Sequence, residues 1–419
     1  MLKQFNFLTL NVDNNTQLKR HQNTVMSFLG KLCRYGFMII IHFIQRLLLY
    51  MSFFASKIFF AKTNKEQWVV GVDEISSMIS LLGNVVAPVK TVSLSKNPYY
   101  TLKYDYHISC ENKLLSYAIR GVYAPILLGY LANTSDKFLY VWNTGFLFDR
   151  DFEFKFLKSK EKKIVCMFLG NDIRAPKLML DYCKDKGLDH FVDYVGAGNP
   201  YYLSDKFLNK KKKAAQSADA YADAVFNAPI DQMSYLECKQ YPLPYMYNKD
   251  LISNNSSKFE NLSKLKVLHA PSSPLLKGTG LVRAAVKKLE MKGYEFEYVE
   301  LQNVSNAEVL EHLKSSHIVL NQFYAFLPGV FGIESMANGC AVLQSANPEI
   351  ETSLPQNERG AWVVTGYWEI YDNLKYLLDN PNEIEKIANK GVDYVRRYHT
   401  YEAASEYIKS VLAENGIES

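Results

Sequence analysis

Residues 329–343 read GVFGIESMANGCAVL, and this stretch decides the fold of the second half of the chain. Its spacing predicts a helix that begins near Gly332 and is followed by a strand over 341–343. Gly329 and Gly332 leave backbone N–H groups free at the helix N-terminus, where they can bind an anion. Glu334 lies in the first turn of this predicted helix, where its carboxylate can accept hydrogen bonds from a vicinal diol. A glutamate there also complements the helix dipole, so a purely structural interpretation stays open.

A second polar feature lies upstream, in the loop PSSPLLKGTG over residues 271–280. This loop connects a strand predicted over Lys266–Ala270 with a helix predicted over Leu281–Lys292. Its Lys277 can neutralise a diphosphate, and Gly278 lets the backbone approach that ligand. A surface lysine without a ligand is the ordinary alternative. Because open α/β sheets bind ligands at the carboxyl ends of their strands, the two features are expected to meet there.

Strands alternate with helices along the rest of the chain, which predicts parallel sheets covered on both faces. The other expected strands are Trp68–Val72, Phe138–Val141, Ile164–Phe168, Ala224–Phe226, Glu295–Val299 and Ile318–Leu320. The other expected helices are Glu74–Leu82, Leu114–Leu131, Ala214–Ala222 and Asn306–Leu313. Pro125 is expected to disturb the long apolar helix that contains it.

Residues 36–60, GFMIIIHFIQRLLLYMSFFASKIFF, are strongly apolar, and two membrane interpretations compete. A spanning helix would bury Arg46 near its middle, at a cost of about 2.5–3.5 kcal/mol. An interfacial helix, the favoured interpretation, would place one polar stripe toward head groups and the apolar face in the acyl boundary. That stripe consists of Lys31, Arg34, His42, Gln45, Arg46, Ser52 and Ser56. A helical hairpin buried against the first domain is the remaining alternative.

The charge distribution separates this segment from the rest of the chain. Residues 1–60 carry seven basic residues and one acidic residue, a net charge of +6, within a total of +5. The remaining 41 basic and 42 acidic residues nearly cancel, so no nucleic-acid partner is expected, whereas an anionic membrane surface is. The six cysteines form no CxxC motif. They are therefore expected to be reduced thiols of a cytoplasmic protein, with no zinc site.

Together these motifs resemble those of the GT-B glycosyltransferases, specifically the family 4-like group of bacterial polysaccharide and lipid-linked glycan enzymes. The stretch ESMANGCAV, residues 334–342, is similar to that group's EAMAxGxPV signature. HAPSSPLLKGTGLVRAAVKKLEMKGYEFEYVEL, residues 269–301, looks like the opening of its donor domain, and the residues from Trp368 onward look like its closing helices. The resemblance covers about 260–419 well and about 65–245 loosely.

The resemblance implies an α/β fold of the GT-B class, with two Rossmann-like domains facing a cleft. The segment 1–62 would associate with the membrane, 63–247 would form the acceptor domain, 248–263 the linker, 264–395 the nucleotide-sugar domain and 396–419 a helix returning to the first domain. The protein would be a metal-independent, retaining transferase with a nucleotide-sugar as co-substrate and no cofactor. It would act in cell-surface polysaccharide synthesis, as a cytoplasmic protein peripherally bound to the inner face of the membrane, on a glycan or lipid-linked acceptor.

The resemblance also assigns donor-side residues. Lys277 would bind the donor phosphates, Glu334 the ribose, and backbone amides near Gly329–Ile333 the diphosphate. The expected donor-binding set is Lys277, Gly278, Thr279, Gln322, Gly329, Gly332, Ile333 and Glu334. Two departures stand out. Phe326 occupies the place of a second family glutamate that contacts the transferred sugar, for which Gln322 is the expected substitute, and an arginine expected shortly before the lysine is absent.

Acceptor-side candidates follow two strands of the first domain. Asp172 and Arg174 belong to GNDIR, which resembles a G-x-D-x-R turn of related enzymes. Asp172, expected with Glu334 to carry the chemistry, would orient or deprotonate an acceptor hydroxyl, and Arg174 would hold a phosphate. Asp172 can equally cap the following helix. Asn143 and Gly145 are expected to border the acceptor.

Other functional classes fit less well. No GxGxxG or GxxxxGK[ST] pattern is present, which argues against a dehydrogenase and a P-loop enzyme. Asp149-Arg150-Asp151 is a DxD triplet of the kind that holds a metal in GT-A enzymes, and it is expected to be accidental. Two alternatives stay open within the fold. One is a nucleotide-sugar epimerase, and the other is a non-catalytic subunit that binds a glycan or a partner transferase.

Overall fold

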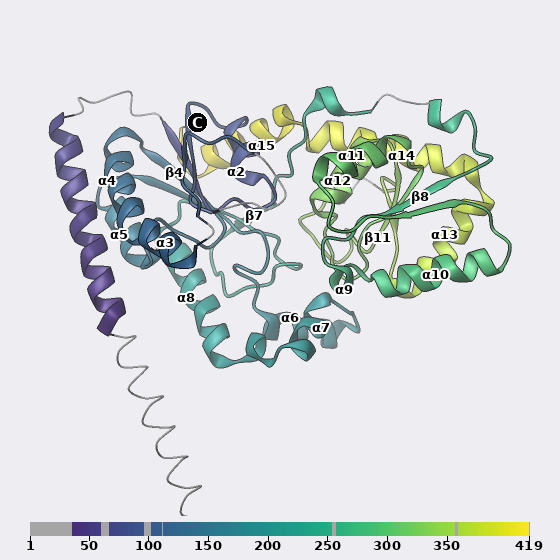
Figure 1. The fold of residues 1–419 in the computed structure, drawn as a ribbon, viewed down its shortest axis with the longest axis horizontal. Coiled ribbons are helices and arrows are strands. Elements are labelled where there is room, and N and C mark those ends of the chain that lie inside the picture. Colours follow the sequence, from purple (N-terminus) through teal and green to yellow (C-terminus); the bar gives the residue numbers. More distant parts are fainter. Residues whose placement is uncertain are drawn as a thin grey trace, which may run out of the picture.

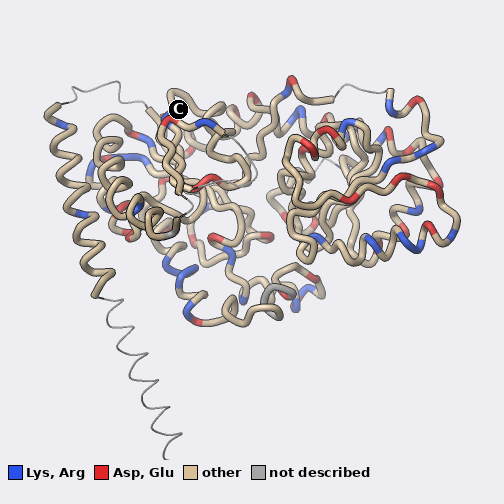
Figure 2. Tube along the Cα trace, viewed as in Figure 1, with Lys and Arg blue, Asp and Glu red and all other residues tan. Residues whose placement is uncertain are grey.

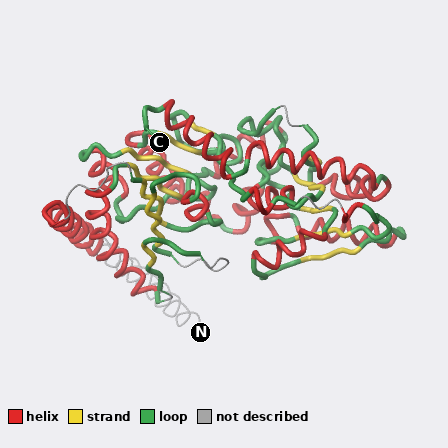
Figure 3. The backbone as a smooth tube through the Cα atoms, turned by 90° about the horizontal axis from the view of Figure 1, so that it is seen from above, coloured by secondary structure: helices red, strands yellow, loops and turns green. Residues whose placement is uncertain are grey.

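The structure is a computed structural model that describes residues 36–59, 67–95, 102–110, 112–253, 257–356 and 359–418. Two α/β domains lie side by side, each built around a parallel sheet, with a long N-terminal helix along the outer side of the first (Figures 1 and 3). Acidic and basic residues are mixed over both domains (Figure 2). The fold is therefore the α/β class that the sequence predicts.

The first sheet has the strand order β3-β2-β1-β4-β5-β6-β7, and every neighbouring pair is parallel. Its strands are β1 (Trp68–Val72), β2 (Val89–Ser93), β3 (Tyr106–His107), β4 (Lys137–Val141), β5 (Lys163–Met167), β6 (Ala224–Phe226) and β7 (Gln240–Tyr241). Because successive side chains point to opposite faces, Val69 joins one buried layer while Trp68 and Val70 join the other. The strand order reverses between β1 and β4, which places a ligand crevice at their carboxyl ends.

Helices cover both faces of this sheet. They are α2 (Met78–Gly83), α3 (Lys113–Ala118), the π-helix η1 (Ile119–Tyr123), α4 (Ala124–Thr134), α5 (Arg150–Lys158), α6 (Pro176–Lys186), α7 (Phe191–Gly198) and α8 (Asp205–Tyr221), with a 3-10 turn at Pro200–Leu203. The long apolar helix is disturbed as predicted: the wide turn of η1 ends two residues before Pro125, which has no N–H to donate.

The second sheet has the order β12-β11-β10-β8-β9, again parallel throughout. Its strands are β8 (Lys266–His269), β9 (Glu297–Glu300), β10 (Ile318–Leu320), β11 (Ala341–Gln344) and β12 (Val363–Val364). Its helices are α9 (Pro274–Lys277), α10 (Thr279–Met291), α11 (Asn306–Ser315), α12 (Gly329–Ala337), α13 (Ile370–Asp379) and α14 (Pro381–Tyr398). Short 3-10 turns lie at Lys249–Leu251, Ser257–Phe259 and Tyr367–Glu369.

The chain crosses back to the first domain at its end. Helix α15 (Tyr401–Glu414) packs Ala404, Ile408, Val411 and Leu412 into the same buried cluster as Trp68. In Figure 1 this helix, drawn in yellow, lies beside β4 and β7 of the first domain. The two domains are therefore joined twice, once through the segment after β7 and once between α14 and α15.

The helix Gly36–Phe59 is attached to the first domain through Gln45, Arg46, Ser52 and Ser56 of its polar stripe, which corrects the expectation that these residues face head groups. Gln45 donates to the Arg120 carbonyl at 3.0 Å and accepts the Phe148 N–H at 3.1 Å, and Ser52 donates to the Ile126 carbonyl at 2.6 Å. The backbones touch at Gly129, where a Cβ would lie 2.6 Å from the Leu49 carbonyl oxygen. Of the predicted stripe, Lys31 and Arg34 lie outside the described residues.

The opposite face of this helix is apolar and exposed. Its large exposed side chains are Phe37, Ile39, Ile40, Phe43, Ile44, Leu47, Tyr50, Met51, Phe54, Ile58 and Phe59. Nearby helix α3 and the following π-helix add Leu114, Leu115, Tyr117 and Val122. Within the described residues, Gly36–Phe59 and Leu114–Thr134 are the helices long and apolar enough to cross a membrane.

Candidate functional site

A pocket of about 520 Å³ lies between the two domains, where the carboxyl ends of both sheets meet. Ala270, Pro271 and Ser272 follow β8, and Glu74, Ile75 and Ser76 follow β1. The remaining lining residues are Lys277, Leu301, Asn303, Val304, Asn306, Val309, Gly329, Val330, Phe331 and Glu334. Both sheets therefore contribute the ends that open α/β sheets use for ligands.

Lys277 ends the short helix α9, directly before Gly278, whose φ of 76° is the left-handed conformation that favours glycine. Its side chain is half-buried and donates a hydrogen bond to the Gln322 side-chain oxygen. Burial lowers the pKa of the ammonium group to about 8, against a smaller favourable effect of the Asp231 carboxylate. Lys277 is therefore a cation whose charge is costly until an anion joins it.

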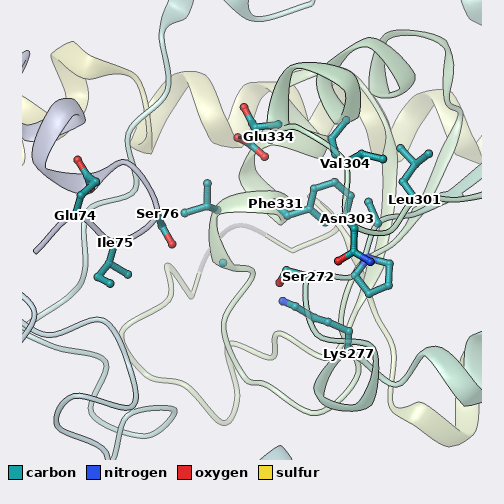
Figure 4. Close-up of a pocket in the computed structure, with 16 residues that line it drawn as sticks. Glu74, Ile75, Ser76, Ser272, Lys277, Leu301, Asn303, Val304, Phe331 and Glu334 are labelled. Carbon is teal, nitrogen blue, oxygen red and sulfur yellow. Dashed lines mark hydrogen bonds between the residues drawn. The ribbon is translucent and has the colours of Figure 1, made fainter. Parts of the chain in front are cut away.

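Glu334 faces the same pocket from the other side, and Figure 4 shows Lys277 and Glu334 pointing into it from different elements. Helix α12 begins at Gly329, earlier than predicted, so Glu334 lies in the second turn and no acidic residue lies in the first. This placement removes the interpretation in which Glu334 serves the helix dipole. Burial raises the pKa of the Glu334 carboxyl to about 7, partly offset by a 3.1 Å hydrogen bond from Asn306.

Tight packing fixes the start of α12. A Cβ on Gly332 would lie 2.8 Å from both the Asn321 and the Gln344 side-chain amides, so only glycine fits there. Gly329 has a φ of 67° and lines the pocket. The remaining expected donor residues, Gly278, Thr279, Gln322, Gly332 and Ile333, are buried behind those that line the pocket.

Thr279 illustrates this supporting arrangement. His269 is fully buried, and its Nδ1 lies 2.6 Å from the Leu320 carbonyl, which can only accept. Nδ1 therefore carries the proton, and Nε2 accepts the Thr279 hydroxyl at 2.9 Å. Burial lowers the pKa of His269 to about 4, so the ring stays neutral. The hydroxyl of Thr279 is thus used to fix the start of α10.

The acceptor-side candidates occupy different surroundings. Asp172 is buried, accepts the Leu169 N–H at 3.1 Å and does not line the pocket. Burial raises its pKa to about 6. Lys211 donates to the carbonyls of Asn171 and Asp172. Lys211 is itself buried, whereas Lys210, Lys212 and Lys213 of the same helix are exposed.

Arg174 is also buried, and its guanidinium group is already paired. Nη2 lies 2.9 Å from Asp231 Oδ2, and Nε donates to the Asp231 carbonyl at 2.7 Å. The group also stacks over the Phe191 ring, 4.6 Å from its centroid. In this arrangement Arg174 fixes the segment that contains Asp231. It does not line the interdomain pocket.

Asn143 and Gly145 follow β4 in a loop that internal contacts define. Asn143 accepts a hydrogen bond from Arg150, and the Gly145 carbonyl accepts one from Arg120 at 3.1 Å. A Cβ on Gly145 would collide with the carboxylate of Glu153. Neither residue lines the interdomain pocket, so their predicted contact with an acceptor stays a prediction.

The DxD triplet has a structural explanation. Asp149 caps α5 by accepting the Phe152 N–H at 3.2 Å, and its other oxygen pairs with Arg46 of the N-terminal helix at 2.9 Å. Among the described residues, no cluster of three or more His, Cys, Asp or Glu side chains could hold a metal ion. Asp149 is therefore committed to a helix cap and an ion pair.

Sequence reasoning missed most of the first-domain wall of the pocket and the partner of Glu334. Ser76 has a positive φ of 51°, which is unusual for a residue other than glycine and marks this turn. Glu74 is buried and accepts the N–H groups of Ile79 and Ser80, so it holds the start of α2. Asn306 carried only one signal, its position at the start of a predicted helix.

Comparisons with known proteins agree with this architecture. Residues 279–410 match the family model described as "Glycosyl transferase-like". A sucrose-phosphate synthase from Thermosynechococcus elongatus superposes with a TM-score of 0.56 at 12% identity, covering 84% of this chain and 99% of its own. WaaG, a glycosyltransferase involved in lipopolysaccharide biosynthesis, gives 0.50 at 11% identity, covering 82% and 99%. No curated protein sequence matches significantly. The structural likeness shows the GT-B fold.

Proposed function

We propose that this chain, a glycosyl transferase-like protein with the GT-B fold, moves a sugar from a nucleotide-sugar donor to a glycan or lipid-linked acceptor at a membrane surface. One observation carries the proposal. Lys277 and Glu334, the two residues that the donor-site resemblance selects, line a single pocket although 57 positions separate them.

The donor would lie across this pocket. The Lys277 ammonium group would pair with the diphosphate, and the backbone N–H groups at the start of α12 would point at the same oxygens. Glu334 would accept hydrogen bonds from the ribose hydroxyls through the oxygen that Asn306 does not occupy. The apolar side chains of Leu301, Val304 and Val309 would then be left to contact the base.

Sugar transfer would begin with departure of the nucleoside diphosphate. Negative charge develops on that leaving group, and a fixed cation with oriented N–H groups stabilises it most in a site that excludes water. Lys277 supplies the cation, so we propose that no metal ion is required. Retention of the anomeric configuration is part of the proposal and follows the resemblance alone.

The acceptor would approach from the first domain. Its pocket wall, residues 74–76, follows β1 and faces the donor-side residues (Figure 4). Asp172, the residue first expected to act on an acceptor hydroxyl, has its carboxylate turned to the Leu169 N–H. We therefore propose that the acceptor hydroxyl meets the donor at this wall. Asp172 would have a structural role, holding the loop that contains Leu169.

The membrane part of the proposal rests on the N-terminal helix. Its polar side chains bind the first domain, so its exposed apolar face would be free to contact the acyl chains of a membrane. A soluble protein rarely exposes such a large contiguous apolar surface without a partner. The helix would lie at the inner face of the membrane, bringing the first domain close to a lipid-linked acceptor.

The test is a thermal-shift measurement with a panel of nucleoside diphosphates and nucleotide sugars. The wild type is compared with Glu334→Ala and Lys277→Ala, and with Glu311→Ala and Lys287→Ala as controls on exposed helix faces. We expect at least one nucleotide to stabilise the wild type and both controls, and to stabilise the two pocket variants much less.

The outcomes separate the alternatives. A nucleotide that stabilises only proteins with an intact pocket identifies the donor base. Product analysis with the matching nucleotide sugar then distinguishes a transferase from an epimerase, which would return an isomer of the donor without any acceptor. Absence of a shift with every nucleotide would remove the transferase proposal and favour the non-catalytic subunit.

A further inference from the structure

Two buried carboxylates, one from each domain, accept hydrogen bonds from the backbone of the other domain. Asp231, in the segment after β6, accepts the Phe326 N–H of the second domain at 2.7 Å. Glu351, in the segment after β11, accepts the N–H groups of Ile230 and Asp231 at 3.1 and 2.6 Å. Each domain therefore supplies a carboxylate that binds the backbone of the other. Such contacts stay well ordered only where the two domains keep a defined position.

Asp231 is held firmly in its own domain. Its side chain is only 5% exposed and pairs with Arg174 at 2.9 Å, while His190 Nε2 lies 3.5 Å from its other oxygen. Burial by itself would raise the pKa of Asp231, but His190, Arg174 and the Phe326 N–H together hold it well below its usual range. Asp231 is therefore an ionised carboxylate when it binds the second domain.

The partner of Asp231 belongs to the loop that supports Lys277. This loop, residues 321–328, follows β10, and its Gln322 binds both the Lys277 ammonium group and the Leu327 carbonyl. Ser345 fixes the same loop from within the second domain, donating to the Ala325 carbonyl at 2.6 Å. The loop is thus tied both to its own sheet and to the first domain, where the Phe191 N–H also donates to the Tyr324 carbonyl at 3.2 Å.

Phe326 contacts the first domain through its side chain as well as through its N–H. The resemblance places a sugar-binding glutamate at this position, but here the side chain packs with Met179, Cys183 and Val192 of the first domain. Its ring lies 5.2 Å from that of His190, centroid to centroid. The residue that would have faced the sugar is therefore used to join the domains.

We propose that Asp231 is a positioning residue for the donor site, which holds the loop 321–328, and through Gln322 the Lys277 ammonium group, in the geometry that binds a diphosphate. The inference rests on the proposed function, since it assumes that Lys277 binds the donor. It makes the donor site a product of both domains. The second domain alone would carry the motif residues without the contact that places them.

The test uses the full chain with Asp231→Asn and a matched control, Asp223→Asn. Asp223 is a half-buried carboxylate of the same domain that pairs with Lys158 at 2.9 Å and accepts the Ile164 N–H at 2.8 Å. It makes no hydrogen bond or ion pair with the described residues of the second domain. Calorimetric titration with UDP, GDP and ADP measures affinity. We expect Asp231→Asn to weaken binding by about tenfold or more, and Asp223→Asn to leave it unchanged.

A pH profile of the affinity separates positioning from general loosening. Among the described residues, the ionisable groups acting on Lys277 are Asp231, which favours its charged form, and His269, whose burial keeps it neutral. In the wild type, affinity should fall as pH rises through the lysine pKa of about 8. In Asp231→Asn this fall should begin at lower pH, whereas Asp223→Asn should follow the wild type.

The results decide the inference in each case. Tight wild-type binding that Asp231→Asn retains, with an unchanged pH profile, overturns it while leaving the proposed function intact. If the wild type binds no nucleoside diphosphate, both are overturned. If Asp231→Asn does not fold, Glu351→Gln decides, because it weakens the same junction and leaves the Arg174 pair in place. Reduced affinity in that variant supports the inference, and unchanged affinity overturns it.

Discussion

The first domain and the donor side of the interdomain pocket use their ionisable groups in different ways. In the first, Glu153, Asp172 and Asp231 each accept backbone N–H groups, so their charges hold loops in place. On the donor side, Lys277 and Glu334 face an open pocket, each with a single neutral hydrogen-bond partner among the residues that the structure describes. Groups of the first kind determine the shape of a cleft, whereas groups of the second kind are available to a ligand. Burial alone therefore does not identify a functional charge, because a buried group whose hydrogen-bonding positions are filled by the protein is not available to a ligand.

The largest effect should come from breaking the first kind of group. Glu153 is fully buried and accepts the Phe146 and Leu147 N–H groups and the Tyr140 hydroxyl. Glu153→Ala leaves three buried donors unsatisfied, which should lower the free energy of unfolding by about 3 kcal/mol or more. The midpoint of chemical denaturation measures this, with Glu153→Gln as a milder control. Equal stability of the two variants would contradict the assigned role.

A smaller effect should follow from disturbing the pocket itself. Gly332→Ala forces a methyl group against Asn321 and Gln344, so it should cost about 1–3 kcal/mol and weaken nucleoside diphosphate binding. Gly280→Ala is the matched control, because its Cβ meets nothing within 4 Å and alanine favours the helix. Thermal shift with and without ligand measures both. A Gly332 variant that binds as the wild type does would show that the start of α12 is not part of the site.

The third prediction concerns the apolar face beside the first domain. Phe43 is 67% exposed on the N-terminal helix, and Phe43→Glu should reduce binding to anionic phospholipid vesicles by about tenfold. Met291→Glu, at an even more exposed apolar position on the second domain, should leave vesicle binding unchanged. Vesicle co-sedimentation gives the comparison. Equal loss in both variants would mean that binding has no preferred face.

The smallest effect is a pH dependence of donor binding. Below about pH 7 the Glu334 carboxyl gains a proton and accepts the ribose hydroxyls less well, and above about pH 8 Lys277 loses its charge. Affinity should therefore be highest between these values and fall a few-fold within one pH unit on either side. Titration of the wild type and of Glu334→Gln checks this, since the variant should lose only the acidic limb.

Much of the architecture follows from periodicity. The strands Ile318–Leu320 and Ala224–Phe226 were predicted with their observed bounds, because short apolar runs between turn residues form buried parallel strands. Lys277 and Glu334, which line one pocket, were predicted from sequence as donor-site candidates, since each sits at a fixed offset from glycines at a helix terminus. The polar stripe of the N-terminal helix was also recognised, but the prediction that Gln45 and Ser52 face lipid head groups was wrong, because both bind the first domain.

Sequence alone was sufficient for the α/β alternation and the parallel sheets, and it predicted Lys277 and Glu334 as donor-site candidates, because these features depend on local spacing along one element and its loop. Only the tertiary structure decided which charges are free. Arg174 and Asp231 are 57 residues apart, and Asp231 and Phe326 are 95 apart, so no local pattern reports their contacts. The same local sequence pattern can place a polar side chain toward a ligand or against a distant backbone amide. What distinguishes them is which other segment folds against them.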